Sequence, residues 1–306
     1  VLTRKALSIG TSIRKAEPRC YSFSITIASR QRGRCRLETQ PWQGGGDEQG
    51  AARSGRFRRW PPARHFSGAG VSLQGWESLY PGIERLGTVF GWNRFGMQGS
   101  DAPGERQTGA GVVAALRELL AYAGVQPPYV LMAHSLGGLF ANLFARLHPA
   151  DVAAVLFLEA THPDDGPLLK KHEPQLVAAL GRMLTLPEAF FEANVHAELA
   201  SVEQTAREIA CAGDFPEVPV RVVTGGLTPK SALDSPGAVG AKRANQQGLA
   251  RLSPLGEQVI AQKSGHFPQL TEPELVLEVL GRLVEDAQAE AGALDPRLRG
   301  DDGLRR

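Results

Sequence analysis

Cysteine and net charge are both scarce in this sequence. The three cysteines, Cys20, Cys35 and Cys211, match neither a disulfide framework nor a zinc-binding pattern, so we interpret them as ordinary thiols. A formal net charge of +2 over 306 residues is too small to indicate a nucleic-acid partner. The composition therefore argues against a disulfide-stabilised secreted domain and against nucleic-acid binding.

Long apolar runs are absent as well. No stretch approaches the ~18 apolar residues that a membrane-spanning helix needs. The apolar segment 21–28 is interrupted by serines and a threonine, which makes it a poor secretory signal. We therefore expect a soluble, cytoplasmic protein without a membrane span, and the hydrophobic content of 42% is ample for a core.

Acidic residues and regular patterns are both lacking near the N-terminus. Glu17 is the only acid in the basic segment 4–36, and three glycines follow one another at 44–46. Apart from a possible strand at 24–28, little hydrophobic periodicity is sustained. Residues 1–66 are therefore predicted to be irregular, and either disordered or not native to the fold of the remainder.

The most informative stretch is 127–149. Tyr129–Ala133 is a short apolar run that predicts a buried strand, and apolar positions at helical spacing follow within about two residues. Between them, Ser135 lies in the sequence Ala-His-Ser-Leu-Gly, close to the Gly-x-Ser-x-Gly pattern of a nucleophile elbow. Such a turn exposes the serine hydroxyl above the sheet, and N–H groups at the start of the next helix can stabilise an anion. His134 is interpreted as structural, because neighbouring side chains on a sharp turn point apart.

Strands and helices alternate over the rest of the chain. The predicted strands are 87–92, 129–133, 153–158, 218–224 and 258–261, and the predicted helices are 108–123, 136–147, 241–252 and one that Thr271 opens with a capping box. The alternation predicts an α/β domain over residues 67–293, with a mostly parallel sheet and helices on both faces. The segment 164–215 is helical in pattern and is predicted to be a lid, and residues 294–306 form a charged tail.

Three motifs resemble the α/β-hydrolase superfamily, and most closely its lid-bearing, esterase-like bacterial members. They are the elbow at Ser135, the sequence Ser264-Gly265-His266-Phe267 after the last predicted strand, and the segment 92–101. The similarity covers roughly residues 67–285. It implies a serine hydrolase that cleaves a carboxylic ester or related acyl compound through an acyl-enzyme, with a small-molecule acyl substrate and no metal or organic cofactor.

The resemblance also implies residue roles. Ser135 is the nucleophile, and His266 is the base that takes its proton and returns it to the leaving group. Leu136 and Ala69 donate the two oxyanion-hole N–H groups, although Ser67 stands where the family usually has histidine.

The acidic partner of His266 has two candidates. The family most often places the acid where this chain has Thr228, which cannot stabilise an imidazolium by charge. Asp234 lies further along the same loop, and Glu159 lies at the end of the preceding strand. We prefer Glu159, because a strand end fixes a carboxylate better than a loop of small residues does.

Two further interpretations remain open from the sequence. The residues His162, Asp164, Asp165, His172 and Glu173 match no metal-ligand spacing, so we interpret them as a solvated hinge of the lid. The alternative to an active enzyme is a non-catalytic small-molecule binder, or an impaired hydrolase copy, on the same fold.

The N-terminal part conflicts with the fold that the resemblance implies. That fold needs a central strand just before residue 68, yet residues 58–66 hold two prolines and three arginines, which suit a central strand poorly. Either the segment 21–28 takes this place or the sheet is incomplete. We hypothesise that residues 1–66 do not descend from a functional hydrolase N-terminus.

Overall fold

The computed structural model describes residues 25–31, 34–38, 63–66, 73–97, 100, 106–175, 177–178, 197–227 and 236–294. The strands are β1 (Ile25–Gln31), β2 (Arg34–Glu38), β3 (Ala63–Phe66), β4 (Val89–Trp92), β5 (Tyr129–His134), β6 (Val152–Leu158), β7 (Val220–Gly225) and β8 (Gly256–Ala261). The α-helices are α1 (Tyr80–Leu86), α2 (Gly109–Tyr122), α3 (Gly137–Leu147), α4 (Asp165–His172), α7 (Val202–Cys211), α8 (Pro236–Ala250), α9 (Pro268–Thr271) and α10 (Pro273–Leu294). Two short 3-10 helices, η1 (Leu73–Trp76) and η2 (Pro149–Asp151), complete the described elements.

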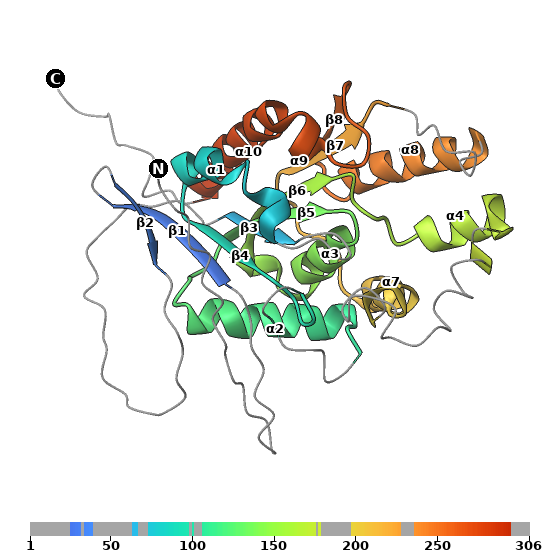
Figure 1. Cartoon of the computed structure of the whole chain (residues 1–306), viewed down its shortest axis with the longest axis horizontal. Coiled ribbons are helices and arrows are strands. Elements are labelled where there is room, and N and C mark those ends of the chain that lie inside the picture. The colour runs from blue at the N-terminus through green and yellow to red at the C-terminus, as the bar shows by residue number, and fades with distance from the viewer. Residues whose placement is uncertain are drawn as a thin grey trace, which may run out of the picture.

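The strands form one sheet in the order β2-β1-β4-β3-β5-β6-β7-β8. Neighbouring strands from β4 to β8 are parallel, whereas β1 pairs antiparallel with β2 and β4 at one edge. Figure 1 shows α1 and α10 over one face of the sheet and α2 and α3 over the other. Each face buries its own hydrophobic cluster. The predicted α/β class, with a mostly parallel sheet between two helical layers, is confirmed.

Most predicted elements are present, with ends shifted by a few residues. The side chain of Thr108 accepts a hydrogen bond from the N–H of Gly111 and caps the start of α2. Gly124, with φ of 65°, follows the end of this helix, as the sequence predicts. All six residues of β5 are buried, as expected for a central strand covered on both faces.

The central strand before residue 68 is present, which corrects the sequence interpretation. β3 lies between β4 and β5, and its residues pair in parallel register with Val130 to Ala133. The segment that begins at Ile25 does not take this place, because β1 is an outer antiparallel strand. The two prolines at 61 and 62 precede the four residues that pair, so they remove no hydrogen bond from this part of the ladder.

The capping box predicted at Thr271 is wrong. Thr271 is the last residue of α9, and α10 begins only at Pro273. The Thr271 hydroxyl instead donates to the hydroxyl of Ser264 at 2.6 Å. This serine belongs to the loop that carries His266, so the threonine helps to hold the site instead of starting the helix.

The longest described helix, α10, is amphipathic. Its buried residues Val276, Val279, Leu280 and Leu283 recur at helical spacing and pack on the sheet. Among the described residues, no helix is both long enough and apolar enough to span a membrane.

The described helices of the insertion between β6 and β7 are α4 and α7. A buried ion pair joins the insertion to the body of the domain. Arg94, in the loop after β4, contacts the carboxylate of Glu198 through two nitrogens, and the side chains are 2% and 0% exposed. The Arg94 guanidinium also lies 5.4 Å from the centre of the Phe140 ring in α3. Arg94 therefore links the insertion to the helix that follows the elbow.

We predict that Glu198→Gln lowers the free energy of unfolding by about 3 to 5 kcal/mol, because the substitution removes the carboxylate that balances a buried guanidinium. Glu203→Gln is the matched control, since Glu203 pairs with Lys170 on the surface and its side chain is 61% exposed. That change should cost less than about 1 kcal/mol. Urea unfolding of both variants measures the difference, and equal losses would contradict the prediction.

Candidate active site

Ser135 lies on a strained turn between β5 and α3. Its φ is 50°, in the left-handed region that residues with a side chain seldom adopt. The turn is held on both sides, because the Ser135 N–H donates to the carbonyl of Leu158 at 3.2 Å and its own carbonyl accepts the N–H groups of Gly138 and Thr161 at 2.9 and 2.8 Å. The geometry is that of the nucleophile elbow which the sequence predicts.

The close packing around Gly138 explains why small residues follow the serine. A Cβ atom at this position would lie 2.6 Å from Cβ of Ala160 and 3.2 Å from the backbone of Thr161. The first turn of α3 therefore packs directly on the loop that follows β6. Any side chain at 138 would push the elbow away from the loop that begins at Glu159.

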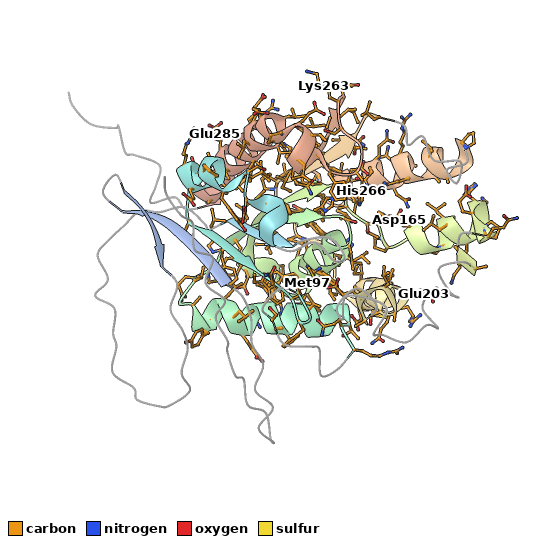
Figure 2. All side chains as sticks on the ribbon, viewed as in Figure 1. Met97, Asp165, Glu203, Lys263, His266 and Glu285 are labelled. Atoms are coloured by element: carbon orange, nitrogen blue, oxygen red, sulfur yellow. The ribbon has the colours of Figure 1, made fainter. Side chains whose placement is uncertain are left out.

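His266 lies beside Ser135. It follows β8 in the chain, and its Nε2 is 3.0 Å from Oγ of Ser135, within hydrogen-bond distance. Figure 2 shows His266 at the end of the sheet from which α4 and Asp165 extend. The imidazole is 40% exposed, so one side of it remains open to an incoming molecule.

The loop before His266 is fixed by hydrogen bonds and by close packing. The carboxylate of Glu272 accepts the Lys263 N–H at 2.8 Å and the Ser264 hydroxyl at 2.6 Å. At the end of β7, a Cβ on Gly225 would lie 2.3 Å from the carbonyl oxygen of Gly265. Glycine at 225 is therefore what lets the end of β7 and the His266 loop approach each other.

Glu159 completes the group. It directly follows β6, has φ of 44°, and donates its N–H to the carbonyl of Val223 at 2.9 Å. One carboxylate oxygen accepts the Gly225 N–H at 2.7 Å, and the other lies 3.6 Å from Nδ1 of His266. A carboxylate can only accept, so this contact favours a hydrogen on Nδ1 of His266 and leaves Nε2 free to accept from the Ser135 hydroxyl.

A lysine that the sequence analysis missed contacts the same carboxylate. Nζ of Lys242, in α8, lies 2.7 Å from the Glu159 oxygen that faces His266. Burial is the largest influence on Glu159 and alone would raise its pKa. The His266 ring, the charge and hydrogen bond of Lys242, and the Gly225 N–H outweigh burial and lower the pKa of Glu159 from 4.5 to about 2. Glu159 is therefore a carboxylate at neutral pH.

His134, which the sequence analysis interprets as structural, contacts the backbone of His266. Its Nε2 is 2.7 Å from the backbone oxygen of His266, and the two rings lie 4.9 Å apart. Nothing in the local sequence signals this contact, because the two histidines are far apart along the chain. The only hint in the sequence was that this histidine directly precedes Ser135.

Of the two predicted oxyanion-hole residues, only Leu136 lies among the described residues. Leu136 lies at the start of α3, where the first N–H groups of a helix have no partner within the helix. Ala69, and with it Ser67, lies outside the described residues. Thr228 and Asp234, which bear on the choice of acid, lie outside them as well.

A cavity of about 350 Å³ lies on the Glu159 side of His266. Its walls come from the loop after β6, from α4, from the end of β7 and from α8. Apolar side chains contribute most of the surface, among them Leu168, Leu169, Leu227 and Val239, while Lys242 and Arg243 add positive charge. The predicted insertion therefore contributes a wall beside the histidine through α4.

Of the five residues considered for a metal site, His162, Asp164 and Asp165 lie at the start of α4, whereas His172 and Glu173 lie at its end. The carboxylate of Asp165 accepts the N–H of His162 at 2.8 Å and the side-chain amide of Asn245 at 2.6 Å, and Nδ1 of His162 accepts the N–H of Asp164 at 3.0 Å. Within the described part of the chain, no group of three or more histidine, cysteine or acidic residues has the arrangement of a metal site.

Comparison with known proteins agrees with the fold. Residues 66–206 match the family model described as the alpha/beta hydrolase fold. A carboxylesterase structure from Nitrososphaera gargenis superposes with a TM-score of 0.58 at 14% identity, over 91% of this chain and 99% of that chain. A probable hydrolytic enzyme from Pseudomonas aeruginosa PAO1 gives a TM-score of 0.57 at 14% identity, over 90% of this chain and 93% of that chain. At such identities the likeness shows the fold alone.

Sequence relatives match over shorter stretches. An uncharacterized protein of Schizosaccharomyces pombe is 39% identical over 84 residues, which is 26% of this chain and 16% of that protein. The chain matches only 16 to 37% of the length of the curated relatives it resembles.

We predict that Lys242→Met raises the pKa of Glu159, because a positive charge 2.7 Å from the carboxylate is lost. Titration of the side-chain carboxyl by ¹³C NMR would show the midpoint moving up from about 2. Arg243→Met is the matched control, since it removes a charge from the same helix and Arg243 is not among the groups that shift this pKa. An unchanged midpoint in the Lys242 variant, or an equal shift in the control, would contradict the assignment.

Proposed function

This chain belongs to the α/β-hydrolase superfamily, and on that premise we propose that it is a serine hydrolase that cleaves a carboxylic ester or a related acyl compound through an acyl-enzyme. The observation that carries the proposal is the 3.0 Å contact between Nε2 of His266 and Oγ of Ser135. A hydroxyl on a strained turn, with an imidazole placed to take its proton, is the arrangement that nucleophilic acyl transfer needs.

The proposed reaction has two halves. In the first, Nε2 of His266 takes the hydroxyl proton while Oγ of Ser135 attacks the acyl carbon, and the carbonyl electrons move onto oxygen. The Leu136 N–H and the start of α3 stabilise this oxyanion, and Ala69 is proposed as the second donor. When the intermediate collapses, the bond to the leaving alcohol breaks and His266 protonates that alcohol. A water molecule then attacks the acyl-enzyme with His266 again as base, which releases the acid and restores the serine.

Glu159 is proposed as the acid of this set. Because its pKa is low, Glu159 is ionised at neutral pH. Its carboxylate faces Nδ1 of His266, so it can stabilise the imidazolium that forms when the serine proton is transferred. The contact of 3.6 Å is longer than an ordinary hydrogen bond, and contacts of this kind commonly shorten when substrate binds.

Ester substrates are supported by the solved structures that share the fold. Their printed descriptions include carboxylesterases of Nitrososphaera gargenis and a thermophilic esterase from Thermogutta terrifontis, whose structure covers 93% of this chain with a TM-score of 0.55 at 14% identity. The helical insertion 164–215 is proposed as a lid, and α4 within it contributes to the cavity beside His266.

One observation favours the alternative of a non-catalytic binder or an impaired hydrolase copy. The Glu159 oxygen that should serve His266 lies closer to Lys242, at 2.7 Å, than to the imidazole, at 3.6 Å. A carboxylate that is already balanced by lysine stabilises an imidazolium less. The reactivity of the Ser135 hydroxyl distinguishes an active hydrolase from a non-catalytic binder or an impaired copy.

We predict that a fluorophosphonate probe labels Ser135 in the full chain, because only an activated hydroxyl reacts quickly with this reagent. Ser135→Ala should abolish labelling, and Ser135→Ala and His266→Ala should each lower turnover of p-nitrophenyl esters by about 10⁴-fold or more. Ser253→Ala, in the turn between α8 and β8, is the matched serine control and should label normally. A folded parental chain that takes up no label would favour the binder.

The choice of acid is tested by a second pair of variants. We expect Glu159→Gln to lower kcat by about 10²- to 10⁴-fold, since the neutral amide no longer stabilises the imidazolium. Asp234→Asn should change kcat by less than about threefold, because the proposed acid is Glu159 and not Asp234. Steady-state kinetics with one ester measures both, and a larger loss in the Asp234 variant would assign the acid to that residue instead.

A further inference from the structure

His134 is a buried imidazole that the proposed reaction does not use. It is the last residue of β5, directly before Ser135, and none of its surface is exposed. Its ring lies 4.9 Å from the ring of His266 and 5.1 Å from the ring of Phe267. A single side chain thus touches both the proposed base and the residue after it.

The direction of its hydrogen bond follows from its partner. Nε2 of His134 lies 2.7 Å from the backbone oxygen of His266, and a carbonyl oxygen can only accept, so Nε2 carries the hydrogen. Nδ1 of His134 is buried and has no hydrogen-bond partner among the described residues, which fits a bare ring nitrogen. Burial, the largest influence, lowers the pKa of His134 to about 4, so the ring is neutral at neutral pH.

We propose that His134 is a positioning residue: its Nε2–H holds the carbonyl of His266 and thereby sets the imidazole of His266 at bonding distance from Ser135. This inference deepens the proposed hydrolase function and rests on it. The same short segment, His134-Ser135, then supplies both the nucleophile and the anchor of the base. The strand end fixes the relative position of the two reacting groups.

The residues before His266 in this loop have anchors of their own. Glu272 holds Lys263 and Ser264, and the Leu227 N–H donates to the carbonyl of Ser264 at 3.0 Å. These bonds fix the loop two or three residues before the base. The bond from His134 reaches the base residue itself, from the side of the elbow.

The expected effect is on turnover and not on substrate binding. Without the anchor, His266 can drift from the serine, and a misplacement of about 1 Å in a reacting pair can cost about 100-fold in rate. His134→Phe, which keeps a ring but removes the donor, should lower kcat about 10- to 100-fold and change KM less than about twofold. The rate of fluorophosphonate labelling at Ser135 should fall in the same proportion.

Two amide variants separate the hydrogen bond from the volume of the ring. Glutamine carries an N–H at about the reach of Nε2, so His134→Gln should retain kcat within about threefold, whereas His134→Asn is one carbon shorter and should lose as much as the Phe variant. Asn142→Ala is the stability control, because it removes a buried side chain of α3 whose amide oxygen accepts a hydrogen bond from Arg146. It should lower the melting temperature without a comparable loss of kcat.

One readout is independent of activity. In the full chain with ¹⁵N-labelled histidine, NMR should show His134 protonated on Nε2 and bare on Nδ1 at pH 7. The opposite tautomer would overturn the proposal even if the protein hydrolyses esters, and so would equal kcat values in the Gln and Asn variants. If the parental chain neither labels nor hydrolyses but the tautomer is as expected, the hydrolase function fails while the anchor stands. Melting curves show which variants are folded. If the Phe variant does not fold, the comparison of the Gln and Asn variants tests the proposal.

Discussion

The left-handed turn at Ser135 is the constraint on which the site depends. A φ of 50° in a residue with a side chain costs about 1 to 3 kcal/mol, so neighbouring bonds must hold it in place. The bonds that do so come from the end of β6 and the loop after it, through Leu158 and Thr161. Glu159 lies between these two residues and is itself left-handed, with φ of 44°. The turn at Ser135 and the proposed acid, Glu159, are therefore parts of one hydrogen-bonded unit, and neither backbone conformation can relax without moving the other.

This coupling continues across the sheet to His266, the proposed base. Glu159 bonds β7 twice, through its N–H to Val223 and through its carboxylate to the Gly225 N–H. Gly225 in turn packs against the carbonyl of Gly265, directly before His266. Because adjacent parallel strands end at the same edge, each link spans only one strand spacing. The carboxylate also receives Lys242 from α8, so a helix on the surface of the sheet influences the charge at its edge.

The parts of the fold that could be predicted are those with local signals. The apolar run of β5, the serine turn and the helical spacing of α3 are contiguous, and Ser264-Gly265-His266 directly follows a recognisable strand. β3 was missed because arginines and prolines dominate the local composition. The strand itself is only four residues long, and it forms its backbone hydrogen bonds with β4 and β5 on its two sides. Lys242, and the contact between His134 and His266, were missed for another reason. Their partners, Glu159 and the His266 carbonyl, are 83 and 132 residues away, and no periodicity reports a contact at such separation.

We propose that the walls of the cavity, more than the shared scaffold, set the selectivity of the proposed hydrolase. Structures only 14% identical to this chain keep the same fold, so the fold alone does not choose a substrate. The cavity of about 350 Å³ is of the size that encloses a small molecule, and its apolar side chains lie on α4 and α8 and in the loop after β7. In α8, Val239 lines the apolar wall, and Lys242, about one helical turn further on, contacts the Glu159 carboxylate. In the proposed hydrolase, a molecule that packs on the apolar wall would therefore lie near the lysine that balances Glu159, and we propose that α8 contributes both to selectivity and to the charge beside His266.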